Sequence, residues 1–441
     1  MQVQVKYLQN NRERVFEQIK DNSLVVIHSG AAPFKSADAT YPFYVNRNFF
    51  YLTGINQEDV TLVIGKINGV KKEFLFIEEN DPVLVKWVGA KLYKNEASEI
   101  SGIDESNILY NNSFNRFMSN YYQSLRYSEG TIETLYLDLE QHDIMFYDTF
   151  GLSYAKTINE KFPAIKIENI YNTIVGLRMV KNSDEVEIMK KSINTTKEAI
   201  YNVMSHNSEL DNEMVAEAYH SFMLHKNAKV ESFGSIVAAG KNATILHYVD
   251  NNMPIEKDSL LLMDVGCFTN NYSSDITRTF PVSGKFTNRQ KEVYEVVLEC
   301  NKKCIEYAKA GITWLEINNY AKKILADGCK KLGLIKEDQE LNKYYYHSIG
   351  HSLGLDVHDP SIYSEGLLEG ILDLIDFIWE LIVKIGDLAK SLYDVLMKLP
   401  DLITSVDNLF GEESAIFDFL GIITNIITIY QLSHKKGISL S

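Results

Sequence analysis

The chain has 441 residues and carries 44 Lys or Arg against 59 Asp or Glu, which gives a formal net charge of −15. Apolar residues make up 45% and charged residues 23%, a composition that is typical of globular proteins and excludes wholesale disorder. The surplus of acidic residues argues against a protein that neutralises phosphates, so we expect no nucleic-acid partner. The length predicts two or three domains.

The four cysteines, Cys267, Cys300, Cys304 and Cys329, are too few for a disulfide scaffold, and no Cys-x-x-Cys pair occurs. Cys300 and Cys304 stand four residues apart in a predicted helix, where two reduced thiols on one face are more typical than a metal clip. The first residues also lack the apolar core of a signal peptide. We therefore expect a cytoplasmic protein.

Residues 1–174 are predicted to form an α/β domain, because short apolar runs alternate there with helical stretches. The first run, with the sequence SLVVIH, has the continuous apolar character of a strand that is buried on both faces. Four such runs, each bounded by polar residues, are the predicted strands of this domain: 23–28, 61–64, 73–77 and 134–139.

The sequence changes character between residues 170 and 190, and we place a domain boundary near residue 175. The segment that starts at residue 172 is predicted to pass from an apolar strand to a charged helix. Asn182 and the two residues after it are candidate caps of this helix, and Glu185 and Glu187 stand where the helix dipole favours acids. Residues 175–360, with strands such as 259–265, form the second predicted domain.

The last part of the chain, 361–441, is rich in Leu and Ile and has five lysines, twelve acidic residues and no arginine. Apolar residues recur in steps of three and four between residues 368 and 399, which predicts an amphipathic helix that Pro400 ends. A further helical stretch, 414–432, is close to the length of a membrane span. A helix that is buried in the protein or in an oligomer is the favoured alternative, so we expect a homo-oligomer, with membrane contact only through 414–432.

Three segments carry residue types that bind metals. Asp264 ends an apolar run, Asp275 follows eleven residues later, and residues 347–359 contain three histidines. Carboxylates bind hard divalent ions, and imidazole suits borderline ions such as Mn, Co, Fe or Zn. Two Asp and one His that converge would suit a hydrolytic metal centre, because the metal acidifies bound water and polarises a carbonyl. Asp356 and Asp359, taken singly, are equally typical of solvated loop acids.

These segments resemble the creatinase/aminopeptidase P ("pita-bread") metallopeptidase family. The matching stretches are ILHY at 245–248, LLMDVG at 261–266, SSDITRTFPVSGKFTNRQKEVY from Ser273, HSIGHSLGLDVHD at 347–359 and, nearer the N-terminus, NFFYLTG at 48–54. The resemblance covers roughly residues 1 to 360 and is closer to an Xaa-Pro aminopeptidase than to a creatinase. It implies an α/β (α+β) fold, with an aminopeptidase P N-terminal domain followed by a pita-bread domain.

The resemblance also implies roles for six residues. Asp264 would chelate one metal, Asp275 would bridge two metals, usually manganese in this family, and His351 would ligate one of them. The residues that would line the substrate site and move protons are His247, His347 and His358. The implied reaction is hydrolysis of the peptide bond before proline, so the substrate would be a peptide with proline in second position.

The family site needs two further carboxylates, one in a Thr-x-Glu-Pro-Gly segment and one in a Gly-x-Arg-x-Glu-Asp segment, and neither segment occurs here. The match stops near Pro360, so the pita-bread domain is predicted to be incomplete. Glu380 stands near the expected distance of the first missing Glu, but it lies inside a helical pattern with no Pro-Gly after it, as an ordinary flanking acid would.

We therefore expect at most one weakly bound divalent ion and little turnover. One alternative is that Glu380, Asp373 or a neighbouring subunit replaces the missing acids. The other is a non-catalytic pita-bread remnant that serves as a binding or assembly protein through its helical tail.

Overall fold

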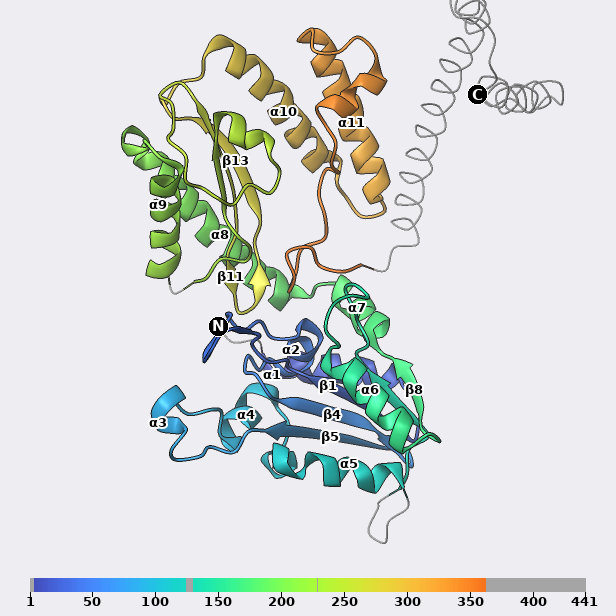
Figure 1. The fold of residues 1–441 in the computed structure, drawn as a ribbon. Coiled ribbons are helices and arrows are strands. Elements are labelled where there is room, and N and C mark those ends of the chain that lie inside the picture. Colours follow the sequence, from blue (N-terminus) through green and yellow to red (C-terminus); the bar gives the residue numbers. More distant parts are fainter. Residues whose placement is uncertain (1–3, 124–129, 228, 362–441) are drawn as a thin grey trace, which may run out of the picture. The chain divides into compact units, whose positions relative to one another are not determined.

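A computed structural model describes residues 4–123, 130–227 and 229–361, which belong to one compact unit that spans residues 1–362 (Figure 1). The predictions for the tail 361–441, including its helices, the stretch 414–432 and Glu380, lie outside the described residues apart from Ser361. The boundary near residue 175 stays a prediction.

The N-terminal half is built on a six-stranded sheet with the strand order β6-β5-β4-β1-β7-β8. Its strands are β1 (Ser23–His28), β4 (Thr61–Ile67), β5 (Val70–Ile77), β6 (Ile108–Tyr110), β7 (Thr134–Leu137) and β8 (Lys166–Asn169). The four predicted strands are thereby confirmed, with β4 and β5 longer than predicted and β7 shorter. β1 lies at the centre, antiparallel to β4 and parallel to β7.

Both faces of this sheet are covered, which explains the continuous apolar sequence of β1. Val25 and Ile27 join the core on one face, and Leu24 and Val26 join the core on the other. The first face is covered by α1 (Val5–Gln18), α2 (Arg47–Thr53), α4 (Lys94–Ser101) and α7 (Tyr171–Met179), and the second by α5 (Phe114–Tyr122) and α6 (Phe150–Lys161) (Figure 1).

The prediction of an apolar strand from residue 172 is wrong, because this segment is helix α7. Ile174, Val175 and Arg178 are the buried residues of the helix, and Ile170 is buried just before it. Steps of four, one and three residues place these side chains on one side of a helix. A short apolar run does not by itself distinguish a strand from a helix, and here the burial decides.

The second half contains a smaller antiparallel sheet with the order β13-β10-β9. Its strands are β9 (Ile236–Ala239), β10 (Leu260–Val265) and β13 (Ile276–Pro281), and a hairpin of β11 (Phe268–Thr269) and β12 (Tyr272–Ser273) connects the last two. The helices are α8 (Ser183–Ser205), α9 (Glu213–Lys226), α10 (Asn288–Tyr307) and α11 (Trp314–Lys331) (Figure 1).

Helix α8 begins where its caps predict. The side chain of Asn182 accepts hydrogen bonds from the backbone N–H groups of Asp184 and Glu185, and the side chain of Glu185 accepts one from Asn182. This reciprocal capping satisfies donors that have no partner within the helix.

Short elements complete the described chain: β2 (Phe34–Ser36), β3 (Ala39–Thr40), α3 (Val85–Val88) and the 3-10 helices η1 (Glu105–Asn107), η2 (Asn111–Ser113), η3 (Asn207–Glu209), η4 (Gly240–Thr244) and η5 (Asp338–Lys343). None of the helices in the described ranges is long and apolar enough to cross a bilayer.

The predicted pair of reduced thiols is confirmed. Cys300 and Cys304 are buried on one face of α10 with their Sγ atoms 3.9 Å apart, and all four cysteines are free. Burial, together with the neighbouring Cys304, raises the pKa of the Cys300 thiol to about 12. A thiol that stays protonated in this way is a weak nucleophile at neutral pH.

Candidate active site

Three of the predicted site residues, Asp264, Asp275 and His351, form a chain of contacts. Asp264 lies on β10 opposite Thr277 of β13, and Thr277 Oγ1 donates to Asp264 Oδ1 at 2.7 Å. Asp275 lies close enough to Asp264 to raise the pKa of the Asp264 carboxyl group. His351 Nε2 lies 3.2 Å from Asp275 Oδ2. The antiparallel register of β10 and β13 therefore brings together two acids that are eleven residues apart.

A backbone contact behind the strands fixes this arrangement. Gly266 follows β10, and a Cβ atom on it would lie 1.9 Å from the carbonyl oxygen of Ser274 and 2.4 Å from Ser232 Oγ. Only glycine allows the two acid-bearing segments to approach this closely.

The electrostatics of the two acids match a site for a cation. Burial, and then the negative charge of Asp275, raise the pKa of Asp264 to about 6, although the hydrogen bond from Thr277 opposes this shift. The hydrogen bond to Asp275 raises the pKa of His351, while burial acts in the opposite direction. Two close carboxylates repel each other unless a proton or a metal ion lies between them.

The described residues bring together three groups that could hold a divalent ion. Oxygen donors from Asp264 and Asp275 and a nitrogen from His351 suit a borderline ion. Throughout the described part of the chain, no three His, Cys, Asp or Glu side chains surround a single metal position.

The other three predicted residues differ in how closely they approach this centre. The ring of His358 stacks on His351, with ring centroids 3.8 Å apart, and burial lowers the pKa of His358. His247 is exposed, and its charge acts on both Asp264 and His358. His347 is also exposed, contacts the backbone oxygen of Ser348 at 2.7 Å, and makes no described hydrogen bond with the carboxylates.

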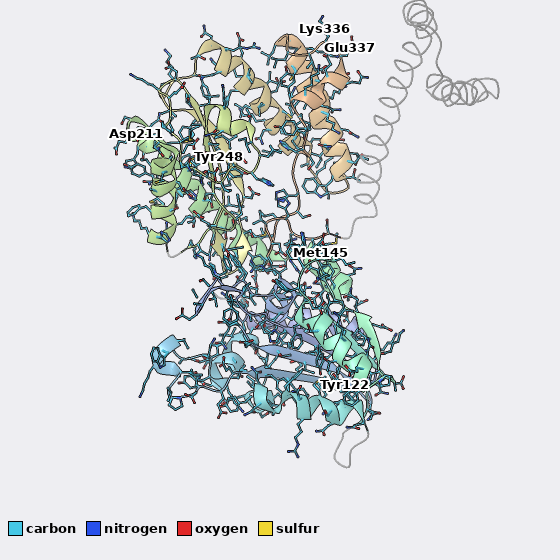
Figure 2. The ribbon with its side chains drawn as sticks, viewed as in Figure 1. Tyr122, Met145, Asp211, Tyr248, Lys336 and Glu337 are labelled. Carbon is cyan, nitrogen blue, oxygen red and sulfur yellow. The ribbon has the colours of Figure 1, made fainter. Side chains whose placement is uncertain are left out.

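Glu213 is a supporting residue that the sequence reasoning missed. It is fully buried at the start of α9 and accepts hydrogen bonds from the N–H groups of Ala239 and Met253. It also accepts hydrogen bonds from the side chains of Asn242 and Tyr248, and Tyr248 is labelled in Figure 2. Burial alone would raise the pKa of Glu213, but these bonds outweigh it and lower the pKa. The loop that carries His247 is therefore held in place by Glu213 through the neighbouring residue Tyr248.

The reading of Asp359 as a solvated loop acid is wrong. Its side chain is 1% exposed and accepts hydrogen bonds from Arg178 and Lys181, both at 2.7 Å. Arg178 also donates to Asp356 and to Asn48 on α2. A buried acid needs such partners, which hold the segment with His351 and His358 against the N-terminal half. The partners stand about 180 residues earlier in the chain, so no local pattern could indicate them.

Comparisons with known proteins decide the family. The model of the metallopeptidase family M24 matches residues 187–373, and that of the aminopeptidase P N-terminal domain matches residues 8–127. The Xaa-Pro aminopeptidase of Haemophilus influenzae is 32% identical over 366 residues, which cover 81% of each chain. The chain belongs to the Xaa-Pro aminopeptidase family.

Other members of the Xaa-Pro aminopeptidase family agree. The Escherichia coli Xaa-Pro aminopeptidase is 29% identical, with 81% of this chain and 82% of the relative covered. A structure of zinc-substituted E. coli aminopeptidase P with product has a TM-score of 0.74 at 27% identity, and the match covers 83% of this chain and 84% of the E. coli chain. A Bacillus anthracis structure with a provisional aminopeptidase P assignment has a TM-score of 0.77 at 41% identity, with 82% and 85% covered. The α/β N-terminal domain and the pita-bread domain are confirmed, and the family implies a divalent metal cofactor.

Proposed function

We propose that this Xaa-Pro aminopeptidase family member removes the first residue from peptides with proline in second position, with low turnover. The observation that carries the proposal is the chain of contacts from Asp264 through Asp275 to His351. These residues would hold one divalent ion, which we propose to be manganese. When bound, the ion would polarise the substrate carbonyl and acidify water.

The remaining side chains would bind and orient the peptide. His358, stacked on His351, and His247, next to the loop anchor Tyr248, would accept or donate protons at the scissile bond. An imidazole side chain suits this work, because it can both accept and donate a proton near physiological pH. His347 would contact the substrate farther from the acids. We attribute the low turnover to the absence of the two family motifs, because each of them would supply one further carboxylate.

The proposal is tested by metal binding and peptide cleavage with the full chain. Titration calorimetry with Mn²⁺ should give about one ion per chain, as the three donors imply. Asp275→Asn should abolish binding, whereas Asp258→Asn, at an exposed acid, should leave it unchanged. Release of glycine from a Gly-Pro peptide should be slow, should stop with a chelator, and should not occur from a Gly-Ala peptide.

Two tightly bound ions with rapid turnover would contradict the expected stoichiometry. In that case, loss of metal binding and of peptide cleavage in Glu380→Gln would identify Glu380 as a replacement ligand. A chain that binds neither metal nor peptide would favour the non-catalytic assembly protein instead.

We also propose a homo-oligomer in the cytoplasm. The free cysteines support a reducing compartment, and the exposed apolar side chains of Leu84, Trp87 and Val88 at α3 support self-association. Sedimentation analysis measures the oligomeric state.

A further inference from the structure

A cavity of about 610 Å³ lies next to the candidate active site. Its lining comes both from the N-terminal half and from the segment that carries His358. Its charged and hydrogen-bonding lining includes Arg47, Glu140, Tyr171, Arg178, Asp356 and His358. The volume is that of a site for a small ligand or for several peptide residues.

The cavity is continuous with the candidate metal centre through His358. This residue lines the cavity, and its ring stacks at 3.8 Å on His351, whose Nε2 lies 3.2 Å from Asp275. An aminopeptidase binds a single residue on the amino side of the bond that it cuts. Only the peptide on the carboxyl side of that bond can therefore reach the cavity.

The two arginines that line the cavity already have acidic partners. Arg178 donates to Asp356 and to Asp359, each at 2.7 Å. Arg47 Nε lies 3.4 Å from Asp356, and Arg47 also donates to Asn271 at 3.0 Å. Each guanidinium is therefore paired with an acid, although Arg178 Nε has no hydrogen-bond partner among the described residues.

Glu140 differs from the other acids of the cavity. It is exposed, it hydrogen-bonds Tyr171, and it forms no ion pair with any residue in the described ranges. Although the residue is exposed overall, partial burial of its carboxyl group and the negative charges of Asp138 and Asp356 raise its pKa, and Arg178 partly opposes them. An acid that lacks a counter-ion and has acidic neighbours lies in a negative potential, which a cation relieves.

We propose that this cavity binds the peptide beyond its proline and that Glu140 selects a Lys or Arg side chain at the third or fourth peptide position. The inference rests on the proposed function, because it takes the ligand to be a peptide with proline in second position. Glu140 is then a specificity-determining residue that does not take part in bond cleavage.

The test compares two amidated peptides, Gly-Pro-Lys-Lys-Gly and Gly-Pro-Gln-Gln-Gly, whose Gly–Pro bond is reduced so that it cannot be hydrolysed. Their affinities for the Mn²⁺-loaded full chain are measured by titration calorimetry at low salt. We expect the lysine peptide to bind roughly five-fold more tightly, as a partly exposed ion pair allows. Glu140→Gln should abolish this preference and leave the affinity for the glutamine peptide unchanged. The control, Glu160→Gln, removes an equal charge at an exposed site on α6 and should keep the preference.

Each other outcome has a definite meaning. If both peptides bind the wild-type chain equally, or if Glu140→Gln keeps the preference, the cationic subsite is refuted while the proposed function stands. If Glu160→Gln abolishes the preference as well, long-range charge explains it and the subsite is refuted. If neither peptide binds, the proposed function fails and this inference fails with it.

Discussion

His220 on α9 is fully buried, and neither of its ring nitrogens has a hydrogen-bond partner among the described residues. Burial lowers its pKa to about 4, because a protonated ring would be a charge without a partner. In the unfolded chain the pKa returns to about 6.5. Between about pH 6.5 and pH 4 this ring is therefore protonated in the unfolded chain but neutral in the folded protein.

We predict that this histidine makes the protein less stable in mild acid. The free energy of unfolding should fall by about 2 kcal/mol between pH 7 and pH 5 through His220 alone. His220→Phe should remove this part of the loss, and His225→Phe, at an exposed site on the same helix, should not. Urea unfolding at both pH values measures the difference, and equal acid sensitivity in all three proteins would contradict the prediction.

At the scale of elements, the loop between β9 and β10 depends on one carboxylate from α9. Glu213 receives two backbone and two side-chain donors, and hydrogen bonds to a charged acceptor contribute about 1.5–3 kcal/mol each when buried. A glutamine in its place would direct its NH₂ group at some of these donors. Because an NH₂ group cannot accept a hydrogen bond, those bonds would be lost.

We predict that Glu213→Gln lowers the free energy of unfolding by roughly 3 kcal/mol. The same change should speed hydrogen exchange at the amides of Ala239 and Met253, because both donate to the Glu213 carboxylate. Glu198→Gln, at an exposed position on α8, is the control and should change neither quantity. Unaltered exchange at these two amides would show that Glu213 does not hold the loop.

The sequence predicted the elements whose signals are local. The predicted bounds of β1 match the structure, because a run of apolar residues with a polar residue at each end marks this strand. The predicted start of α8 also matches, because its capping residues lie within three positions of one another in the sequence. α7 was missed because its short apolar run fits either period. For the site, the motifs predicted Asp264, Asp275 and His351. Glu213 could not be predicted, because its partners include backbone N–H groups 26 and 40 residues away.

At the scale of the whole described unit, the two halves share a core and an ion-pair network. Ile188, Tyr272 and Leu355 of the second half pack in the same core as the N-terminal helices. Arg178 and Asp359 form the centre of the network and are almost fully buried. Removing one partner of such a pair costs more than removing both, because a lone buried charge remains.

We predict that Arg178→Met destabilises the protein by about 3–5 kcal/mol. The double variant Arg178→Met with Asp359→Leu should recover part of this loss, because the unpaired acid is then also removed. Chemical denaturation of the two single variants and the double variant gives the coupling energy. Additive effects, with no coupling, would show that the pair does not join the halves. Lys190→Met, in an exposed pair on α8, serves as the control.

The contact at Gly266 has a consequence for how this protein tolerates mutation. Gly266 has no side chain and takes part in no chemistry, yet any Cβ atom there would collide with the backbone of Ser274 and push apart the two segments that bear the acids. In a saturation screen scored by metal retention, position 266 should accept no other residue, although Asp264 and Asp275 themselves stay unchanged. The positions at which a mutation would disrupt the metal centre therefore include residues that are not ligands.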